Sequence, residues 1–143
     1  MMRNPQIQDA SNLASLKTVE FIFDSSGLSE FEKDLIKTEA ELRLRKAGIP
    51  VVTEQKFDYG FAFVYVQVQL LTNSVCYGGQ VDLDVHQWAP FPRFKDTIEL
   101  IIWQAKGMTV LGPVATKVEE AQVVVDAQLD AFILAWMRSH PKS

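Results

Sequence analysis

Hydrophobic and polar positions change their spacing several times along this chain of 143 residues. Apolar side chains recur at every second position over residues 16–23, which predicts a β-strand that ends in the turn-forming run 24–27. The spacing becomes helical over residues 30–47, and a short apolar run at 49–53 predicts another strand. The first third of the chain therefore predicts a strand–helix–strand unit.

This first predicted helix has a clear start and a clear end. Ser29 is a favourable N-cap, and Glu32 stands three residues later, where the two side chains can satisfy each other's backbone amides. Gly48 favours a C-terminal cap, and Pro50 cannot continue a helix. The helix is therefore expected to lie between Ser29 and Gly48.

Two apolar stripes run along this helix on roughly opposite sides. The stronger stripe consists of Phe31, Leu35, Thr38 and Leu42. The weaker stripe consists of Ile36, Ala40, Leu44 and Ala47. We expect one broad buried face flanked by long Glu and Lys side chains, and the alternative is a partner molecule on the weaker stripe.

From residue 60 onward apolar side chains recur at every second residue. The clearest strand places aliphatic side chains on one face, namely Ala62, Val64, Val66, Val68 and Leu70. Alternating runs at 81–88 and 98–103 predict two further antiparallel strands, and 108–111 predicts either a continuation of the last one or an extra strand. A final helix begins near Thr116, which has Glu119 at capping-box spacing, and carries one continuous apolar stripe.

Together these elements predict an α+β fold: a β-α-β unit, then an antiparallel three- to four-strand meander, then a C-terminal helix, with the helices packed on a mixed sheet. We assign residues 16–138 to a single domain. Residues 1–15 are expected to form a flexible N-terminal arm, and residues 139–143 a flexible tail.

The face of the meander opposite its aliphatic core is the main candidate site. If both hairpin strands point their aliphatic residues at the core, Tyr65 pairs with His86 and Phe63 with Trp88, to within a step of two residues. The predicted patch consists of Phe63, Tyr65, His86, Trp88, Ile101 and Trp103. Aromatic side chains bury about 150–250 Å² each, so this surface is expected to be covered by its own chain, by a second subunit or by a small ligand.

Two other features were considered as sites. Asp82, Asp84 and His86 share one face of a strand, but their steps of about 6.6 Å favour a solvated surface over a metal site. The connection at 89–96 brings Phe91, Arg93 and Phe94 together. These three residues suit an anionic or protein partner, although we prefer the interpretation that the phenylalanines close one end of the core.

Composition limits the possible functions. The net charge is −4, from 18 acidic and 14 basic residues that are interspersed, which argues against nucleic-acid binding. Cys76 is the only cysteine, so no intramolecular disulfide is possible. No catalytic, nucleotide-binding or metal-binding signature occurs, and we expect no cofactor and no catalytic residue. No stretch is long and apolar enough to predict a transmembrane segment.

Three segments carry a resemblance to known proteins: TEAELRLRKAGIPVV, FAFVYVQVQLL and IIWQAKG. In this order the chain resembles an uncharacterised family of small bacterial α+β proteins that are often exported. The order of elements is also similar to the N-terminal domain of the TolB translocation protein, which implies an interaction module of the cell envelope. The chain as given begins without a signal segment, so we expect a cytoplasmic location, or a periplasmic one if an upstream targeting segment has been removed.

The sequence thus predicts a non-enzymatic interaction or structural domain that self-associates through the outer aromatic face. The expected partner is a second copy or another protein. The alternative is a small-molecule-binding or hydrolytic protein that uses His86, with Asp84 and Tyr65, in a groove on the same face.

Overall fold

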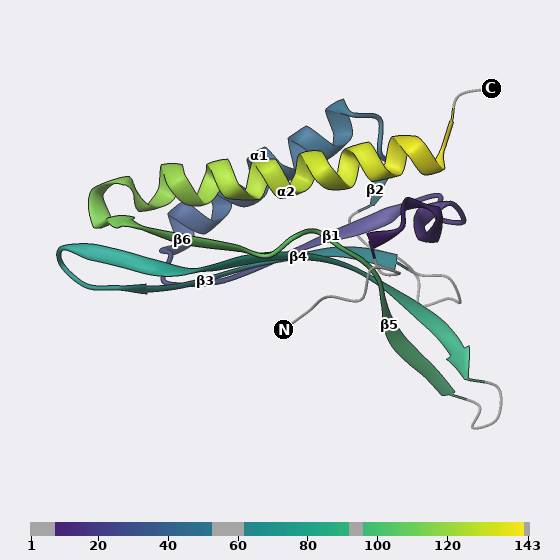
Figure 1. The fold of residues 1–143 in the computed structure, drawn as a ribbon, viewed down its shortest axis with the longest axis horizontal. Helices are drawn as coiled ribbons and strands as arrows, with labels where there is room; N and C mark the ends of the chain where they lie inside the picture. Colours follow the sequence, from purple (N-terminus) through teal and green to yellow (C-terminus); the bar gives the residue numbers. More distant parts are fainter. Residues whose placement is uncertain (1–7, 53–61, 92–95, 142–143) are drawn as a thin grey trace.

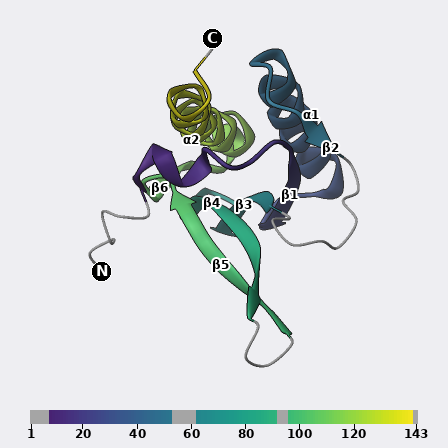
Figure 2. The ribbon, with the colours of Figure 1, turned by 90° about the vertical axis from the view of Figure 1, so that its right-hand side faces the viewer.

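The computed structural model describes residues 8–52, 62–91 and 96–141. A mixed six-stranded sheet carries two long helices on one face (Figures 1 and 2), which confirms the predicted α+β class. The elements are η2 (Ala10–Leu13), β1 (Val19–Ser26), α1 (Glu30–Lys46), β2 (Val51–Val52), β3 (Ala62–Thr72), β4 (Cys76–Phe91), β5 (Asp96–Gln104), β6 (Met108–Pro113), η4 (Val114–Thr116) and α2 (Lys117–Ser139).

The β1–α1–β2 unit forms as predicted. The Ser29 hydroxyl accepts a hydrogen bond from the Glu32 amide, and the Glu32 carboxylate accepts one from the Ser29 amide, so the capping box is complete. Gly48 has a φ of +84°, the left-handed conformation that ends many helices. The chain then returns as β2, which pairs in parallel with β1.

The second half of the sheet is the predicted antiparallel meander. Strand β4 is its longest member, and two neighbours share it: β5 pairs with its second half and β6 with its first half. The segment at 108–113 is therefore the predicted continuation of β5: after an interruption at 105–107 it follows the same edge of β4 in nearly the same register. Since β1 is parallel to β3, the complete sheet is mixed.

The β3–β4 hairpin keeps the predicted faces but differs in register by two residues. Phe63 pairs with His86, and Tyr65 pairs with Asp84. The turn explains the shift, because the side-chain oxygen of Asn73 accepts hydrogen bonds from the amides two and three residues later and closes the hairpin early. Each predicted residue nevertheless stays on its face, since a shift of two preserves the alternation.

Helix α1 packs on the sheet through the weaker of its two stripes. Ile36, Ala40 and Leu44 are fully buried, whereas Phe31 of the stronger stripe is 73% exposed. The expectation of one broad buried face is therefore wrong, and the weaker stripe covers the chain's own sheet. Just past the helix, Ile49 is buried as well, and its amide donates to the carbonyl of Leu44.

Helix α2 lies beside α1 on the same face of the sheet (Figure 2). Its predicted apolar stripe reaches the core at Ala121, Val125, Leu129, Phe132 and Trp136. Gln128 is a buried polar residue in this stripe. Its side-chain amide donates to the carbonyls of Val81 and Lys106, close to where β4 changes partner from β5 to β6.

The start of α2 differs from the predicted capping box. Thr116 makes no cap bond to the helix, and its hydroxyl bonds to the Glu120 carboxylate instead. Tyr77, only 1% exposed, donates to the same carboxylate over 2.6 Å. Burial and this hydrogen bond raise the pKa of Tyr77 to about 12, and the bonds from Thr116 and Tyr77 lower the pKa of Glu120.

Parts of both terminal segments pack on the domain. Leu13 of η2, within the predicted arm, is fully buried, and Leu16 is nearly so. At the other end, the His140 ring stacks on Trp136 with centroids 4.0 Å apart. The Nε2 atom of His140 lies 2.6 Å from the carbonyl oxygen of Leu16, so residues near the two ends of the chain are in contact.

Candidate functional site

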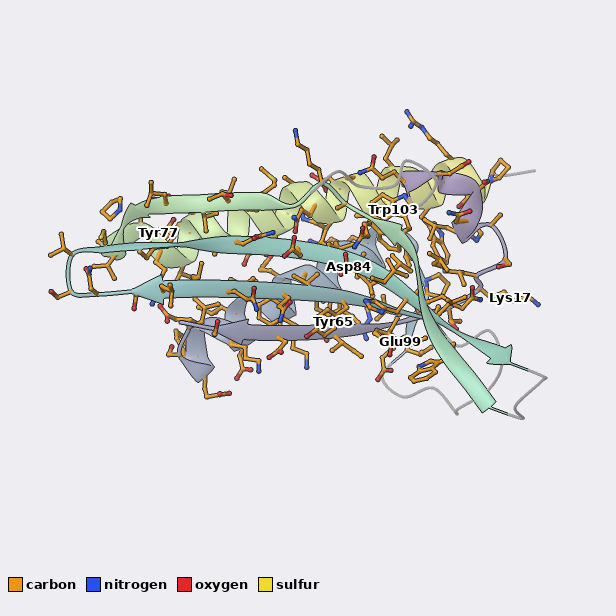
Figure 3. The ribbon with its side chains drawn as sticks, turned by 60° about the horizontal axis from the view of Figure 1, so that its bottom comes forward. Lys17, Tyr65, Tyr77, Asp84, Glu99 and Trp103 are labelled. Carbon is orange, nitrogen blue, oxygen red and sulfur yellow. The ribbon has the colours of Figure 1, made fainter. Side chains whose placement is uncertain are left out.

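The outer face of the sheet, opposite α1 and α2, carries five of the six predicted patch residues. Figure 3 shows this face with Tyr65, Asp84 and Glu99 labelled. Strand register arranges them in rows that cross the sheet. One row is Glu20, Phe63, His86 and Ile101. The next row is Ile22, Tyr65, Asp84 and Gln104. Trp88 and Glu99 form a shorter row beyond them.

Trp103 is the exception, because it lies in the core. It pairs with Val85, which is fully buried, and its ring meets Phe132 edge to face with centroids 5.8 Å apart. A register shift between Val85 and His86 produces this arrangement. The β-bulge adds one residue to β5, so Ile101 and Trp103 no longer share a face as simple alternation requires.

His86 occupies the centre of the outer face. Its ring stacks on Phe63 at 4.9 Å and meets Tyr65 edge-on at 5.9 Å. Its Nδ1 atom lies 2.6 Å from a Glu99 oxygen, and its Nε2 atom lies 3.9 Å from an Asp84 oxygen. Both nitrogens are buried, and neither contact has the alignment of a hydrogen bond.

The ring of Tyr65 contacts His86, but its hydroxyl group bonds elsewhere. Its hydroxyl donates to the Asp24 carboxylate over 3.2 Å. Partial burial, reinforced by Asp24 and then by Asp84, raises the pKa of Tyr65. The phenol therefore stays protonated at neutral pH, and it is placed as a hydrogen-bond donor to Asp24 rather than as a nucleophile beside the imidazole.

The charged strand residues described on this face are all acidic. Five carboxylates project from it, those of Glu20, Asp24, Asp82, Asp84 and Glu99. No strand residue in the described part of the chain is Lys or Arg. Sequence reasoning treated the acidic and basic residues as interspersed, and only the register shows that the strands collect acids on the outer side.

The exposed apolar area of this face is smaller than the sequence predicted. Phe63 is only 8% exposed although it lies on the outer side, whereas Ile101 is 41% exposed. Tyr65 and Trp88 are half-buried. The face is thus an acidic surface with an aromatic floor and one prominent aliphatic side chain.

The other candidate sites from the sequence receive no support from the described residues. The side chains of Phe91, Arg93 and Phe94 lie outside the described residues. Within the described ranges, no cluster of His, Cys, Asp and Glu has the arrangement to hold a metal ion. In that same part of the chain, no helix has the length and apolar character needed to cross a bilayer. Ile22, Asp24 and Gln104 belong to the face but were not predicted, although strand alternation could have located Ile22 and Asp24.

Comparison with known proteins adds only distant similarities. No protein-family model and no curated protein matches the chain. A minor lipoprotein from Acinetobacter baumannii is 13% identical, with a TM-score of 0.35 over 87% of this chain and 95% of that one. A protein described as a neuraminyllactose-binding hemagglutinin homolog from Helicobacter pylori is 12% identical, with a TM-score of 0.36 over 100% and 89% of the two chains. These values assign the chain to no family.

Proposed function

We propose that this protein is a non-enzymatic interaction domain whose outer sheet face binds a positively charged segment of another protein. One observation carries the proposal: the face combines five carboxylates with an aromatic floor and has no Lys or Arg among the described strand residues. A surface of one sign attracts a partner of the opposite sign and speeds the encounter.

Self-association through this face has weaker support. An isologous dimer places the same patch of both copies in contact. Carboxylates such as Asp84 and Glu99 would then come close to identical carboxylates, and such like-charge contacts cost several kcal/mol. The burial of Trp103 and Phe63 also leaves less apolar area to offset that cost. A basic partner has neither disadvantage.

The side chains of the face define what the partner should offer. Arg or Lys side chains can pair with Asp84 and Glu99 and can lie against the aromatic rings of Tyr65 and Trp88. An apolar residue beside them can cover Ile101, which is the most exposed large side chain of the predicted patch. A segment that alternates basic and aliphatic residues therefore fits this face best.

The test uses two labelled peptides of equal length, one alternating Arg and Leu and the other alternating Glu and Leu. Fluorescence anisotropy measures their binding to the whole protein at low and at physiological ionic strength. We expect binding of the basic peptide only, weakened by salt. Glu99→Gln and Ile101→Ala should each reduce the affinity.

Two matched variants control for general charge and hydrophobicity. Glu119→Gln makes the same change at an exposed glutamate of α2, and Leu134→Ala truncates a side chain of α2 that is 49% exposed. Both should bind like the wild type. The proposal is wrong if the acidic peptide binds equally well, or if Glu99→Gln and Glu119→Gln weaken binding to the same extent.

A further inference from the structure

The stronger apolar stripe of α1 points straight away from the sheet. Phe31 is 73% exposed, Leu35 47% and Leu42 43%, and Thr38 between them is exposed as well. At 100° per residue these positions lie opposite the buried stripe, so they are not the margin of the core. An outward row of large apolar side chains on a helix indicates a contact surface.

A groove lies directly beside this stripe, between α1 and α2. It has a volume of about 450 Å³. Its lining residues are Glu39, Leu42, Arg43 and Lys46 of α1, Ala47 just past that helix, and Asp130 and Ile133 of α2. That volume is within the range of pockets that hold whole small ligands, so a single phenylalanine ring fits into it. One surface of the protein thus carries both a groove and an exposed side chain, Phe31, of a size that the groove can hold.

The two ends of α1 carry opposite charges. Its first turn contains Glu30 and Glu32, its last turn contains Arg43, Arg45 and Lys46, and charges of both signs lie between them. Two such helices attract each other when they run antiparallel, because each acidic end then meets a basic end. The helix dipoles favour the same orientation.

The geometry fixes which residues would meet. In an antiparallel pair with a two-fold axis at Thr38, Phe31 of one copy reaches the level of Arg45 of the other, because both are equally far from Thr38. This is the level at which Leu42 and Ala47 line the groove. Each copy then contributes its Phe31 side chain and its α1–α2 groove, as an isologous interface requires.

We infer that two copies of this chain associate through α1, antiparallel about Thr38, with Phe31 of each copy seated in the α1–α2 groove of the other. The helices lie on one side of the sheet and the acidic face on the other (Figure 1). Such a dimer keeps both outer faces accessible to a partner.

Sedimentation velocity over a range of concentrations tests the interface. We expect a dimer for the wild type, and Phe31→Asp should weaken it about tenfold or more, since buried aromatic anchors dominate most interfaces. Leu71→Asp is the matched control, because Leu71 is 85% exposed at the far side of the sheet. Circular dichroism checks that both variants remain folded, as expected for exposed positions.

A cross-linking experiment tests the orientation. In a Cys76→Ser background, Thr38→Cys should form a disulfide-linked dimer under mild oxidation, because only a residue on the two-fold axis meets its own copy. Thr109→Cys, exposed on β6, is the control and should remain unlinked. A monomeric wild type, or a dimer that survives Phe31→Asp but dissociates with Ile101→Asp, overturns the inference. The second outcome would place self-association on the outer sheet face.

Discussion

Gly27 and Gly48 offer a direct test of how the chain enters and leaves α1. Both have positive φ, +85° and +84°, and both stand beside α1. Their surroundings differ, because a Cβ atom at Gly48 would meet no heavy atom within 4 Å, whereas one at Gly27 would lie 2.4 Å from the carbonyl oxygen of Leu70. Alanine at each position therefore imposes the same backbone strain, with a steric clash at only one of them.

The expected losses of unfolding free energy follow from this difference. A left-handed backbone costs a residue with a Cβ atom about 1–2 kcal/mol. The reduced entropy of the unfolded chain returns about 0.4–1 kcal/mol, so Gly48→Ala should lose roughly 1 kcal/mol. Gly27→Ala should lose a further 1–3 kcal/mol or so, because Leu70 belongs to β3 and cannot withdraw without disturbing the sheet.

Guanidinium unfolding of the wild type and both variants measures these losses, with circular dichroism as the signal. The midpoints should shift while the slope stays constant, which shows that the variants unfold in the same cooperative way. Equal losses for Gly27→Ala and Gly48→Ala would refute the close approach of Gly27 to Leu70. A larger loss at Gly48 would refute the assignment of open space around it.

Four further changes probe side-chain contacts. Gln128→Met should cost about 1–3 kcal/mol of unfolding free energy, because it deprives two main-chain carbonyls of a buried donor, and urea unfolding measures it. Wild-type stability should fall as pH rises from about 10 to about 12, because the folded state keeps Tyr77 protonated while the unfolded state ionises; Tyr77→Phe, compared by unfolding at several pH values, should lack this fall. The pKa of Glu120 is lowered in the folded state, so its ionised carboxylate stabilises the protein above the pKa that Glu120 has in the unfolded chain. This stabilisation is lost as the pH falls through the folded-state pKa, and Glu120→Gln should reduce the loss of stability in acid. His140→Ala should lower the melting temperature by a few degrees, because it removes the contact with Leu16.

Local rules predicted the β1–α1–β2 unit and the alternation of β3 well. Ser29, Glu32 and Gly48 determine the ends of α1 by contacts within a few residues, so their spacing is visible in the sequence. The side of α1 that meets the sheet depends instead on tertiary packing, which overrides local signals. Large side chains such as Phe31 and Leu35 made the wrong stripe look like the core.

The candidate site was predicted only in part, because local alternation is visible in the sequence whereas the pairing between strands is not. Alternation within each strand placed Phe63 and Tyr65 of β3 and His86 of β4 on the outer face correctly. Trp103 was misplaced because one bulged residue in β5 reverses the alternation, and no residue pattern in that strand marks the bulge. The acidic character of the face was missed because it depends on the register of four strands together.

The length of β4 has a consequence for how the protein moves. Its last pair with β3 is Ala62↔Gln87, so among the described residues the end of β4, from Trp88 to Phe91, pairs only with β5 (Figure 2). A two-stranded ribbon is only marginally stable by itself, so amide protons there should exchange with solvent sooner than those nearer the middle of the sheet. Trp88 and Glu99 stand at the root of this ribbon. We therefore expect the outer face to be stiffer at His86 than at this end, where the proposed partner would meet a segment that can change shape without disturbing the core.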